Sequence, residues 1–377
     1  MKKRSSFIFT LNAMALIFIT LLPTCSKKEA QKETEVITIG IITPLSGEAA
    51  DLGEEMLQSA KMALEQSNSQ YSQQFKLVPR DDQMSAAVAS TAVRSLLEQE
   101  KTIAILAAGN SPVARGQVQA LRGKKIPLIS PSATASNLSE GVDYVFRVIP
   151  PNSAQGKALV DFAFKLGAKT AAIIFQHDDY STDLKTAFKD GFQLKGGSIS
   201  VEVGFEWEET DFRAQLNQIK NSGADVIMCF AQHVQVSRVL VRARELGINQ
   251  PILSGETAYT DKLLNAAANS AEGFYVTGTP VDLANASPQL KRFIEEYKSK
   301  YGKNPGVYGV YSYDAIGLVT SVIANGNPKN GAELIKMLNE VKGYKGITGD
   351  IHFNEKGEVL REYKIYIVKN GKFVLYQ

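Results

Sequence analysis

The sequence predicts an α/β protein made of two doubly wound lobes, each built on a parallel sheet. Short β-rich apolar runs alternate with amphipathic helical stretches after residue 35, a pattern typical of right-handed βαβ units. Without its N-terminal leader the chain has roughly 350 residues, more than one hydrophobic core usually serves. A strand followed by a polar loop also occurs at similar places in the two halves. Together these observations favour two lobes of one architecture.

The expected elements follow from the spacing of apolar residues along the chain. Continuous apolar or β-branched runs predict buried strands, and apolar residues at intervals of three and four predict helices. The expected strands cover residues 36–42, 75–78, 103–107, 127–130, 170–175, 199–203, 226–230 and 251–254. The expected helices cover residues 53–68, 86–100, 112–122, 154–166, 182–194, 211–221 and 234–246.

The N-terminal segment has the layout of a signal peptide. Basic residues at 2–4 precede an apolar run at 7–22 that is short for a membrane span. The run ends in Leu-Pro-Thr-Cys at 22–25, which resembles the lipobox of bacterial lipoproteins. This resemblance implies that Cys25 is lipidated and becomes the first mature residue, with residues 26–35 as a polar tether. The alternative is an ordinary signal peptide followed by an unrelated cysteine.

The charge balance gives no reason to expect nucleic acid or an anionic membrane surface as a partner. The whole sequence holds 42 Lys and Arg against 39 Asp and Glu, and three of the basic residues lie in the leader. The mature chain therefore has a formal net charge of zero. Such a chain has no overall electrostatic attraction to phosphate-rich partners. We expect it to contact a membrane only through its lipid anchor.

Motifs for catalysis or for a tightly bound cofactor do not occur in the sequence. The histidines, His177, His233 and His352, form no pair at metal-ligand spacing. No Gly-x-Ser-x-Gly elbow, Walker A loop or Gly-x-Gly-x-x-Gly turn is found. Cys229 lies in an apolar run, so we expect a buried, inert thiol. The sequence therefore predicts a binding protein without metal or cofactor rather than an enzyme.

The repeated strand and loop place Thr134 and Glu256 at equivalent positions. A strand at 127–130 leads into Pro-Ser-Ala-Thr, and a strand at 251–254 leads into Gly-Glu-Thr. Open α/β sheets bind ligands beyond the carboxyl ends of their strands. Two facing lobes would therefore bring Thr134 and Glu256 to opposite walls of one cleft. The alternatives are that Thr134 is a turn residue and that Glu256 is only an acid at the start of a helix.

Another loop of the first half is a candidate anion site. Gly-Asn-Ser-Pro at 109–112 follows the strand expected at 103–107. Ser111 is expected to be the N-cap of the next helix, and Pro112 its first residue. The free N–H groups and positive potential of a helix start suit a carboxylate. The alternative is a cap that binds nothing.

In their order and spacing, several motifs resemble the Leu/Ile/Val-binding family of type I periplasmic solute-binding proteins. They are Ile-Gly-Ile-Ile-Thr-Pro-Leu-Ser-Gly at 39–47, the loops within 109–134, Asp-Asp-Tyr at 178–180, Ala-Arg-Glu-Leu-Gly at 243–247, Ala-Glu-Gly at 271–273 and the stretch 350–373. The resemblance covers nearly all of residues 36–377. It implies two lobes joined by three hinge crossings, with one cleft that closes around a ligand.

The resemblance also implies roles for particular residues. In the amino-acid binders of this family, the positions matching Ser111 and Thr134 hold the α-carboxylate of the ligand. The carbonyl group at the position of Ser132 and the acid at the position of Glu256 receive the α-ammonium. The position matching Tyr180 contributes from the second lobe. Because a carboxylate in a closed cleft needs a cationic partner, Glu256 is the most informative of these residues.

Two positions of the expected pocket depart from the family pattern. Leu52 stands where many members have an aromatic ring, and Gln232 stands where a small or aromatic residue is more usual. Leu52 favours an apolar ligand side chain, whereas Gln232 suits a polar one. Other branches of the family bind amides, urea or aromatic acids. The prediction of an amino acid therefore depends on Ser111, Thr134 and Glu256 together.

The expected organisation has four parts. The sequence predicts a lipoprotein signal peptide at residues 1–25, a tether at 26–35, a first lobe at 36–150 plus 281–353, and a second lobe at 151–280 plus 354–377.

The resemblance implies a monomeric solute-binding component of an ABC importer. We expect it on the periplasmic or cell-surface side of a bacterial membrane, with a small-molecule ligand and a permease of the inner membrane as partners. A ligand-sensing receptor subunit that signals through a membrane partner is the alternative.

Overall fold

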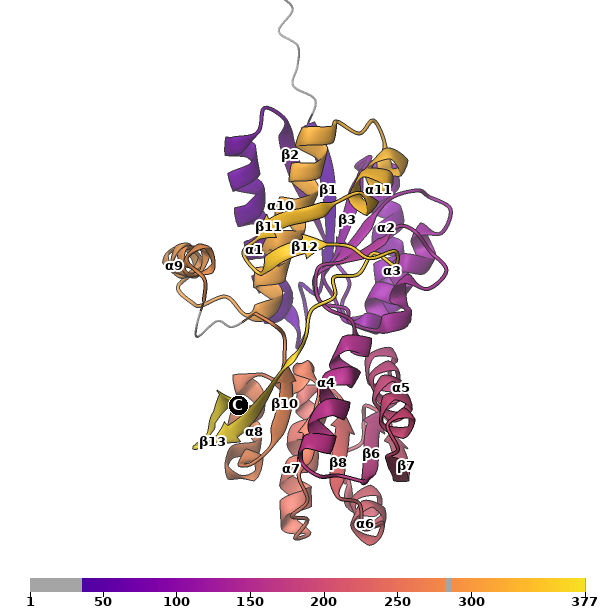
Figure 1. Cartoon of the computed structure of the whole chain (residues 1–377). Helices are drawn as coiled ribbons and strands as arrows, with labels where there is room; N and C mark the ends of the chain where they lie inside the picture. The colour runs from indigo at the N-terminus through magenta and orange to yellow at the C-terminus, as the bar shows by residue number, and fades with distance from the viewer. Residues whose placement is uncertain (1–35, 282–285, 377) are drawn as a thin grey trace, which may run out of the picture. The chain divides into compact units, whose positions relative to one another are not determined.

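The computed structural model describes residues 36–281 and 286–376, so the predicted leader, Cys25 and the tether lie outside the described residues. The first sheet has five parallel strands in the order β2-β1-β3-β4-β5. Its strands are β1 (Val36–Thr43), β2 (Gln74–Asp81), β3 (Ala104–Ala107), β4 (Leu128–Ser130) and β5 (Val145–Arg147). We call this sheet and the elements packed with it the first lobe (Figure 1).

The helices of the first lobe come from two separate parts of the chain. They are α1 (Ala50–Gln70), α2 (Ala86–Gln99), α3 (Ser111–Leu121), α9 (Pro288–Tyr301), α10 (Val307–Gly326) and α11 (Gly331–Asn339). One continuous hydrophobic cluster joins residues 39–149 to residues 281–359. A two-stranded antiparallel hairpin, β11 (Lys342–Gly346) and β12 (Gly349–His352), completes this lobe.

The second sheet has seven strands in the order β14-β13-β10-β9-β8-β6-β7. Its strands are β6 (Thr170–Gln176), β7 (Ser198–Phe205), β8 (Val226–Phe230), β9 (Ile252–Ser254), β10 (Tyr275–Gly278), β13 (Lys364–Lys369) and β14 (Lys372–Leu375). Its helices are α4 (Asn152–Lys165), α5 (Asp179–Leu194), α6 (Arg213–Asn221), α7 (His233–Glu245) and α8 (Asp261–Ala267). We call this assembly the second lobe.

Helices cover both faces of the second sheet. Along β6, Ala172 and Ile174 belong to a hydrophobic cluster that includes α6, α7 and α8. Their neighbours Ile173 and Phe175 belong to another cluster, which includes α4 and α5. Because successive side chains of a strand point to opposite faces, these clusters lie on the two sides of the sheet. This arrangement confirms the doubly wound architecture predicted from the sequence.

The second sheet is not wholly parallel, which corrects the expected topology. β13 pairs antiparallel with β10, and β14 pairs antiparallel with β13. Asn370 and Gly371 join these last strands, both with positive φ angles of 53° and 68°. Such a two-residue turn matches the twist of an antiparallel hairpin, whereas parallel strands need a long crossover.

The chain passes between the lobes three times. It leaves the first lobe after β5, returns after β10, and leaves again in the segment 353–363 between β12 and β13. The family resemblance also implies three crossings between the lobes. The exact boundaries of the predicted lobes remain a prediction, and the core of the first lobe extends to Val359.

The elements expected before residue 281 are present, apart from shifts of a few residues at their ends. The sequence analysis did not predict β5, α8 or β10, which the structure adds. One cap differs from the prediction: Ser111 is already helical, and Asn110 is the N-cap of α3. The Asn110 side-chain oxygen accepts a hydrogen bond from the N–H of Val113, and Pro112 is the second helical residue. Asn and Ser cap equally well, and Pro suits either early position, so the sequence alone did not distinguish these registers.

Helix α10 has no amphipathic pattern because most of its surface is buried. It is long and apolar enough to cross a membrane, but 61% of its most apolar window is buried inside the protein. It packs against α1 in the first lobe (Figure 1). A helix that is hydrophobic on all sides is typical of a core position. For this reason periodicity did not identify it.

Candidate functional site

The predicted ligand residues lie at the carboxyl ends of parallel strands. β3 and β4 of the first lobe lead into the loops that hold Ser111 and Thr134, and β9 of the second lobe leads into Glu256. Tyr180 stands in the first turn of α5, just after β6. The carboxyl edge of an open α/β sheet is where ligands bind. The fold therefore presents polar groups from both lobes at such edges.

The carboxylate of Glu256 connects the two lobes. The Thr134 hydroxyl of the first lobe donates to its Oε1 at 3.5 Å, and the Tyr180 hydroxyl of the second lobe donates to its Oε2 at 2.9 Å. All three side chains are buried. The bond from Tyr180 has good length, whereas the contact with Thr134 is at the outer limit for a hydroxyl donor. The structure thus brings together three of the predicted site residues.

The surroundings of Glu256 disfavour its negative charge. Burial raises the pKa of Glu256 to about 6, although the hydrogen bonds from Tyr180, Gln155 and Thr134 partly oppose this shift. Within residues 36–281 and 286–376, no Lys or Arg forms an ion pair with this carboxylate. A buried carboxyl group without a counter-charge is a favourable partner for a cation supplied by a ligand.

Three further tyrosines lie within electrostatic range of Glu256. They are Tyr308 and Tyr311 of α10 and Tyr363 of the third crossing. Burial, with an added contribution from the charge of Glu256, raises the pKa of each phenol. These side chains therefore stay neutral at physiological pH. Sequence reasoning missed them, and the spacing of Tyr308 and Tyr311 on one helix face was the available signal.

Ser111 and Ser132 hold the two ligand loops of the first lobe against each other. The Ser111 hydroxyl oxygen accepts a hydrogen bond of 3.2 Å from the N–H of Ala135. The Ser132 hydroxyl donates to the carbonyl oxygen of Gly109 at 2.7 Å. Both hydroxyls thus have a structural partner, and the carbonyl of Ser132 is the group to which the family resemblance gives a ligand role.

Leu52 and Gln232 form no hydrogen bond with Glu256 or with the side chains that contact it. Leu52 lies in the first turn of α1, and 37% of its surface is exposed. Gln232 is the N-cap residue of α7, where its side chain makes no capping hydrogen bond. Their predicted role in reading the ligand side chain remains a prediction.

Gln155 is a supporting residue that the sequence did not reveal. Its side-chain oxygen accepts hydrogen bonds from the backbone N–H of Glu256 at 2.7 Å and from the Thr277 hydroxyl at 2.5 Å. A Cβ at Gly255 would lie 2.1 Å from the Tyr180 hydroxyl oxygen and 2.7 Å from the Gln155 oxygen. Only glycine permits this close approach. Gln155 and Gly255 together set the position of the Glu256 backbone.

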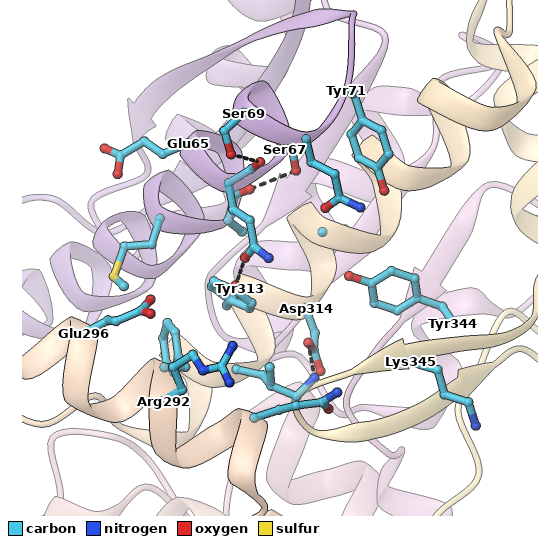
Figure 2. Close-up of a pocket in the computed structure, with 18 of the residues that line it drawn as sticks. Glu65, Ser67, Ser69, Tyr71, Arg292, Glu296, Tyr313, Asp314, Tyr344 and Lys345 are labelled. Carbon is cyan, nitrogen blue, oxygen red and sulfur yellow. Dashed lines mark hydrogen bonds between the residues drawn. The ribbon is translucent and has the colours of Figure 1, made fainter.

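Two hollows of the described surface lie away from these residues. One, of about 660 Å³, lies in the first lobe among α1, α9, α10 and β11, with Arg292, Tyr313 and Tyr344 in its lining (Figure 2). The carboxylate of Asp314 at this hollow accepts hydrogen bonds of 2.8 Å from the N–H groups of Ile347 and Thr348. It therefore anchors the β11–β12 turn.

The other hollow, of about 750 Å³, lies between α4 and residues 360–365. None of the predicted ligand residues lines either hollow. No cluster of three or more His, Cys, Asp or Glu side chains suited to a metal ion occurs in the part of the chain that the structure describes. Cys229 is fully buried, and burial raises the pKa of its thiol to about 12, so the thiol is inert as expected.

The sequence is similar to those of known solute-binding proteins over almost its whole described length. The model of the periplasmic binding protein family matches residues 36–372. The Leu-, Ile-, Val-, Thr- and Ala-binding protein of Pseudomonas aeruginosa is 24% identical over 354 residues, covering 91% of this chain and 90% of that protein.

Two solved structures are similar over almost their whole length. The leucine-binding protein LivK of Thermotoga maritima superposes with a TM-score of 0.84 at 26% identity, covering 90% of this chain and 98% of that one. LivJ of Streptococcus pneumoniae, solved in complex with isoleucine, has a TM-score of 0.80 at 26% identity, with the same coverage. These matches agree with the resemblance that the sequence motifs show and with the two-lobed fold. The chain belongs to the periplasmic binding protein family, a family of solute-binding proteins and not of enzymes.

Proposed function

We propose that this protein is the extracytoplasmic solute-binding component of an ABC importer, and that its lobes close on an amino acid or a closely related amphipathic solute. The observation that carries this proposal is the buried carboxylate of Glu256, which Thr134 and Tyr180 contact from the two lobes and which no cation among the described residues pairs with. The similar proteins are named or solved as binders of leucine, isoleucine and other amino acids, which supports the same ligand class.

The ligand charges follow from the chemistry of the two sides. On the second lobe, Glu256 and the Tyr180 hydroxyl form an acceptor group for an ammonium. On the first lobe, the start of α3 at Ser111 and the loop at Thr134 offer donors to a carboxylate. A zwitterion would satisfy both sides at once, and closure would remove both charge pairs from water together. Ligand binding and lobe closure would then be one coupled event.

Exchange of the Glu256 carboxylate for an amide tests the ammonium site. Glu256→Gln is expected to weaken binding of L-leucine or L-isoleucine by about 3–5 kcal/mol, because the buried ammonium would lose its counter-charge. The analogue 4-methylpentanoate lacks only the α-amino group of leucine. It should bind wild type poorly and lose much less affinity in Glu256→Gln. Calorimetry of both ligands on both proteins gives the comparison.

One control variant and one further test variant complete this experiment. Glu206→Gln changes an exposed carboxyl group of the same lobe and should leave affinity unchanged. Thr134→Val tests the carboxylate side, and it should cost about 1.5–3 kcal/mol of binding energy. It is cleaner than Ser111→Ala, which would also leave the N–H of Ala135 without its partner. If Glu256→Gln binds the amino acid as well as wild type does, Glu256 is structural and the proposed ligand class is wrong.

The pKa of Glu256 predicts how affinity depends on pH. Because only the ionised carboxylate pairs with an ammonium, bound ligand should lower this pKa from its value of about 6. At pH 5 roughly one tenth of the unliganded sites would be ionised, so affinity should fall about tenfold between pH 7.5 and pH 5. The neighbouring tyrosines stay neutral over this range and add no slope.

The raised pKa of Glu256 makes the stability of the ligand-free protein fall as pH rises, whereas ligand affinity rises. A raised carboxyl pKa means that the Glu256 contribution is most favourable below its ordinary value near 4.5 and is lost as pH rises through about 6. Asp82 and Asp314, whose pKa values burial also raises to about 6, add the same slope without contacting Glu256. Titration calorimetry and thermal melts of wild type and Glu256→Gln across pH 5–7.5 separate these groups. An affinity that does not change with pH in wild type would contradict the assigned ion pair.

Lobe closure has its own prediction. Saturating ligand should reduce the radius of gyration in small-angle scattering, because the cleft loses solvent as the lobes meet. A ligand that binds only the folded protein should also raise its stability by about 2.7 kcal/mol at a hundredfold excess over Kd. A stabilised protein with an unchanged radius of gyration would mean that binding occurs without hinge motion.

Anchoring is tested at Cys25. We expect a lipid on this residue to hold the protein at a membrane, since acyl chains contribute about 0.8 kcal/mol per buried CH₂. Wild type and Cys25→Ser are expressed in a bacterial host, and membrane and soluble fractions are compared. Wild type should be found with the membrane and the variant should be soluble. Equal solubility of the two proteins would show that Cys25 is not an anchor.

A further inference from the structure

Arg147 is the largest fully buried side chain of the first lobe, and its contacts lead to the ligand loop. It ends β5, and its Nη1 donates to the carbonyl oxygen of Ala135 at 2.5 Å. Its Nη2 also reaches the carbonyl oxygen of Ser136 at 3.3 Å. Ala135 directly follows Thr134, so the guanidinium holds the backbone that carries a predicted ligand residue. A buried arginine needs such partners because its desolvation is costly.

The partner charge of Arg147 lies on the third crossing. Its Nη2 forms an ion pair with Oε1 of Glu358, whose side chain is 6% exposed. The backbone reinforces this contact, since the N–H of Arg147 donates to the carbonyl oxygen of Gly357 at 2.8 Å. Asn354 in turn holds Glu358 through hydrogen bonds to its carboxylate and its backbone N–H. The pair thus ties the end of β5 to the segment that leads from β12 to β13.

The same loop also touches the second lobe. The carbonyl oxygen of Thr134 accepts a hydrogen bond of 2.7 Å from the N–H of Asn152, at the start of α4. The N–H of Ser136 donates to Oδ2 of Asp183 on α5 at 2.7 Å. The loop at 134–136 is therefore attached to Arg147 and to α4 and α5 of the second lobe, and through Arg147 it is connected to Glu358 of the third crossing. A rotation of the lobes about the crossings would move these attachments relative to one another.

We propose that Arg147 and Glu358 are positioning residues for ligand binding, which couple the loop carrying Thr134 to the third hinge crossing. The proposal rests on the function proposed above. It assigns to a pair that touches no ligand the task of keeping the Thr134 loop in its binding position as the hinge moves. Because both groups are buried and attached at the hinge, a change in either alters the loop and the closure together.

The decisive variant replaces the ion pair by apolar side chains of similar volume. Arg147→Met/Glu358→Leu removes both charges, and such replacements of buried pairs often leave stability equal or higher. We expect a melting temperature at or above that of wild type. We also expect faster amide exchange confined to peptides covering residues 134–140, and L-leucine affinity weakened between about 2-fold and 30-fold. The exchange measurement uses the ligand-free protein, so it does not depend on the identity of the ligand.

A matched control and a conservative variant complete the test. Lys185→Met/Glu202→Leu removes a partly buried ion pair of the second lobe and should change neither readout at residues 134–140. Glu358→Asp keeps the charge but shortens the side chain, so it should show a smaller effect of the same kind. If the double variant does not fold, Glu358→Asp still decides, because wild-type exchange and affinity in that variant would overturn the proposal.

The outcomes for the two proposals differ. A double variant that melts like wild type, keeps wild-type exchange at 134–140 and binds L-leucine as well as wild type shows that the pair only fills the core. Wild type that binds no amino acid refutes the proposed ligand class. In that case the exchange of residues 134–140 still decides whether the pair positions the loop.

Discussion

The buried carboxylate of Glu256 is the constraint on which the site depends. A carboxyl group removed from water is stable only with donors or a counter-charge around it. Here Thr134 and Tyr180 supply hydroxyl donors, and the described residues supply no cation, so burial raises the pKa of Glu256. The free protein thus keeps an unfavourable charge that a ligand ammonium can neutralise. Under the proposed function, part of the binding energy would come from relief of this cost.

The support around Glu256 links the site to the hinge. Gln155, in the first turn of α4, accepts the backbone N–H of Glu256 and is itself bonded to Asn152, the first residue of that helix. Asn152 also donates to the carbonyl oxygen of Thr134. Because α4 begins at the first crossing between the lobes, the walls of the site and the hinge share the same few residues. A rearrangement at one therefore reaches the other through direct contacts.

Sequence reasoning predicted the parts of the site that belong to motifs and missed those that belong to packing. Thr134 and Glu256 follow similar strands and stand out as polar residues in equivalent loops. Gln155 and Arg147 lie inside a helix and a strand where no spacing marks them, and their importance comes from residues more than a hundred positions away. Helix α10 is apolar on all sides and was therefore not predicted, so only the spacing of Tyr308 and Tyr311 could have indicated these tyrosines.

The buried side chains of Arg147 and Glu256 differ in whether the fold provides an opposite charge beside them. The charge of Arg147 is matched within the fold by Glu358, which under the proposal above lets the pair serve as a fixed frame. Among the described residues Glu256 has only neutral donors, so under the proposed function its charge is matched by a ligand. If both groups were compensated, the site would have little reason to close on an ammonium. If neither were, the loop that carries Thr134 would have no fixed position from which to close. Under the proposed function, the protein therefore combines one charge pair that is matched within the fold with one charge that the ligand matches.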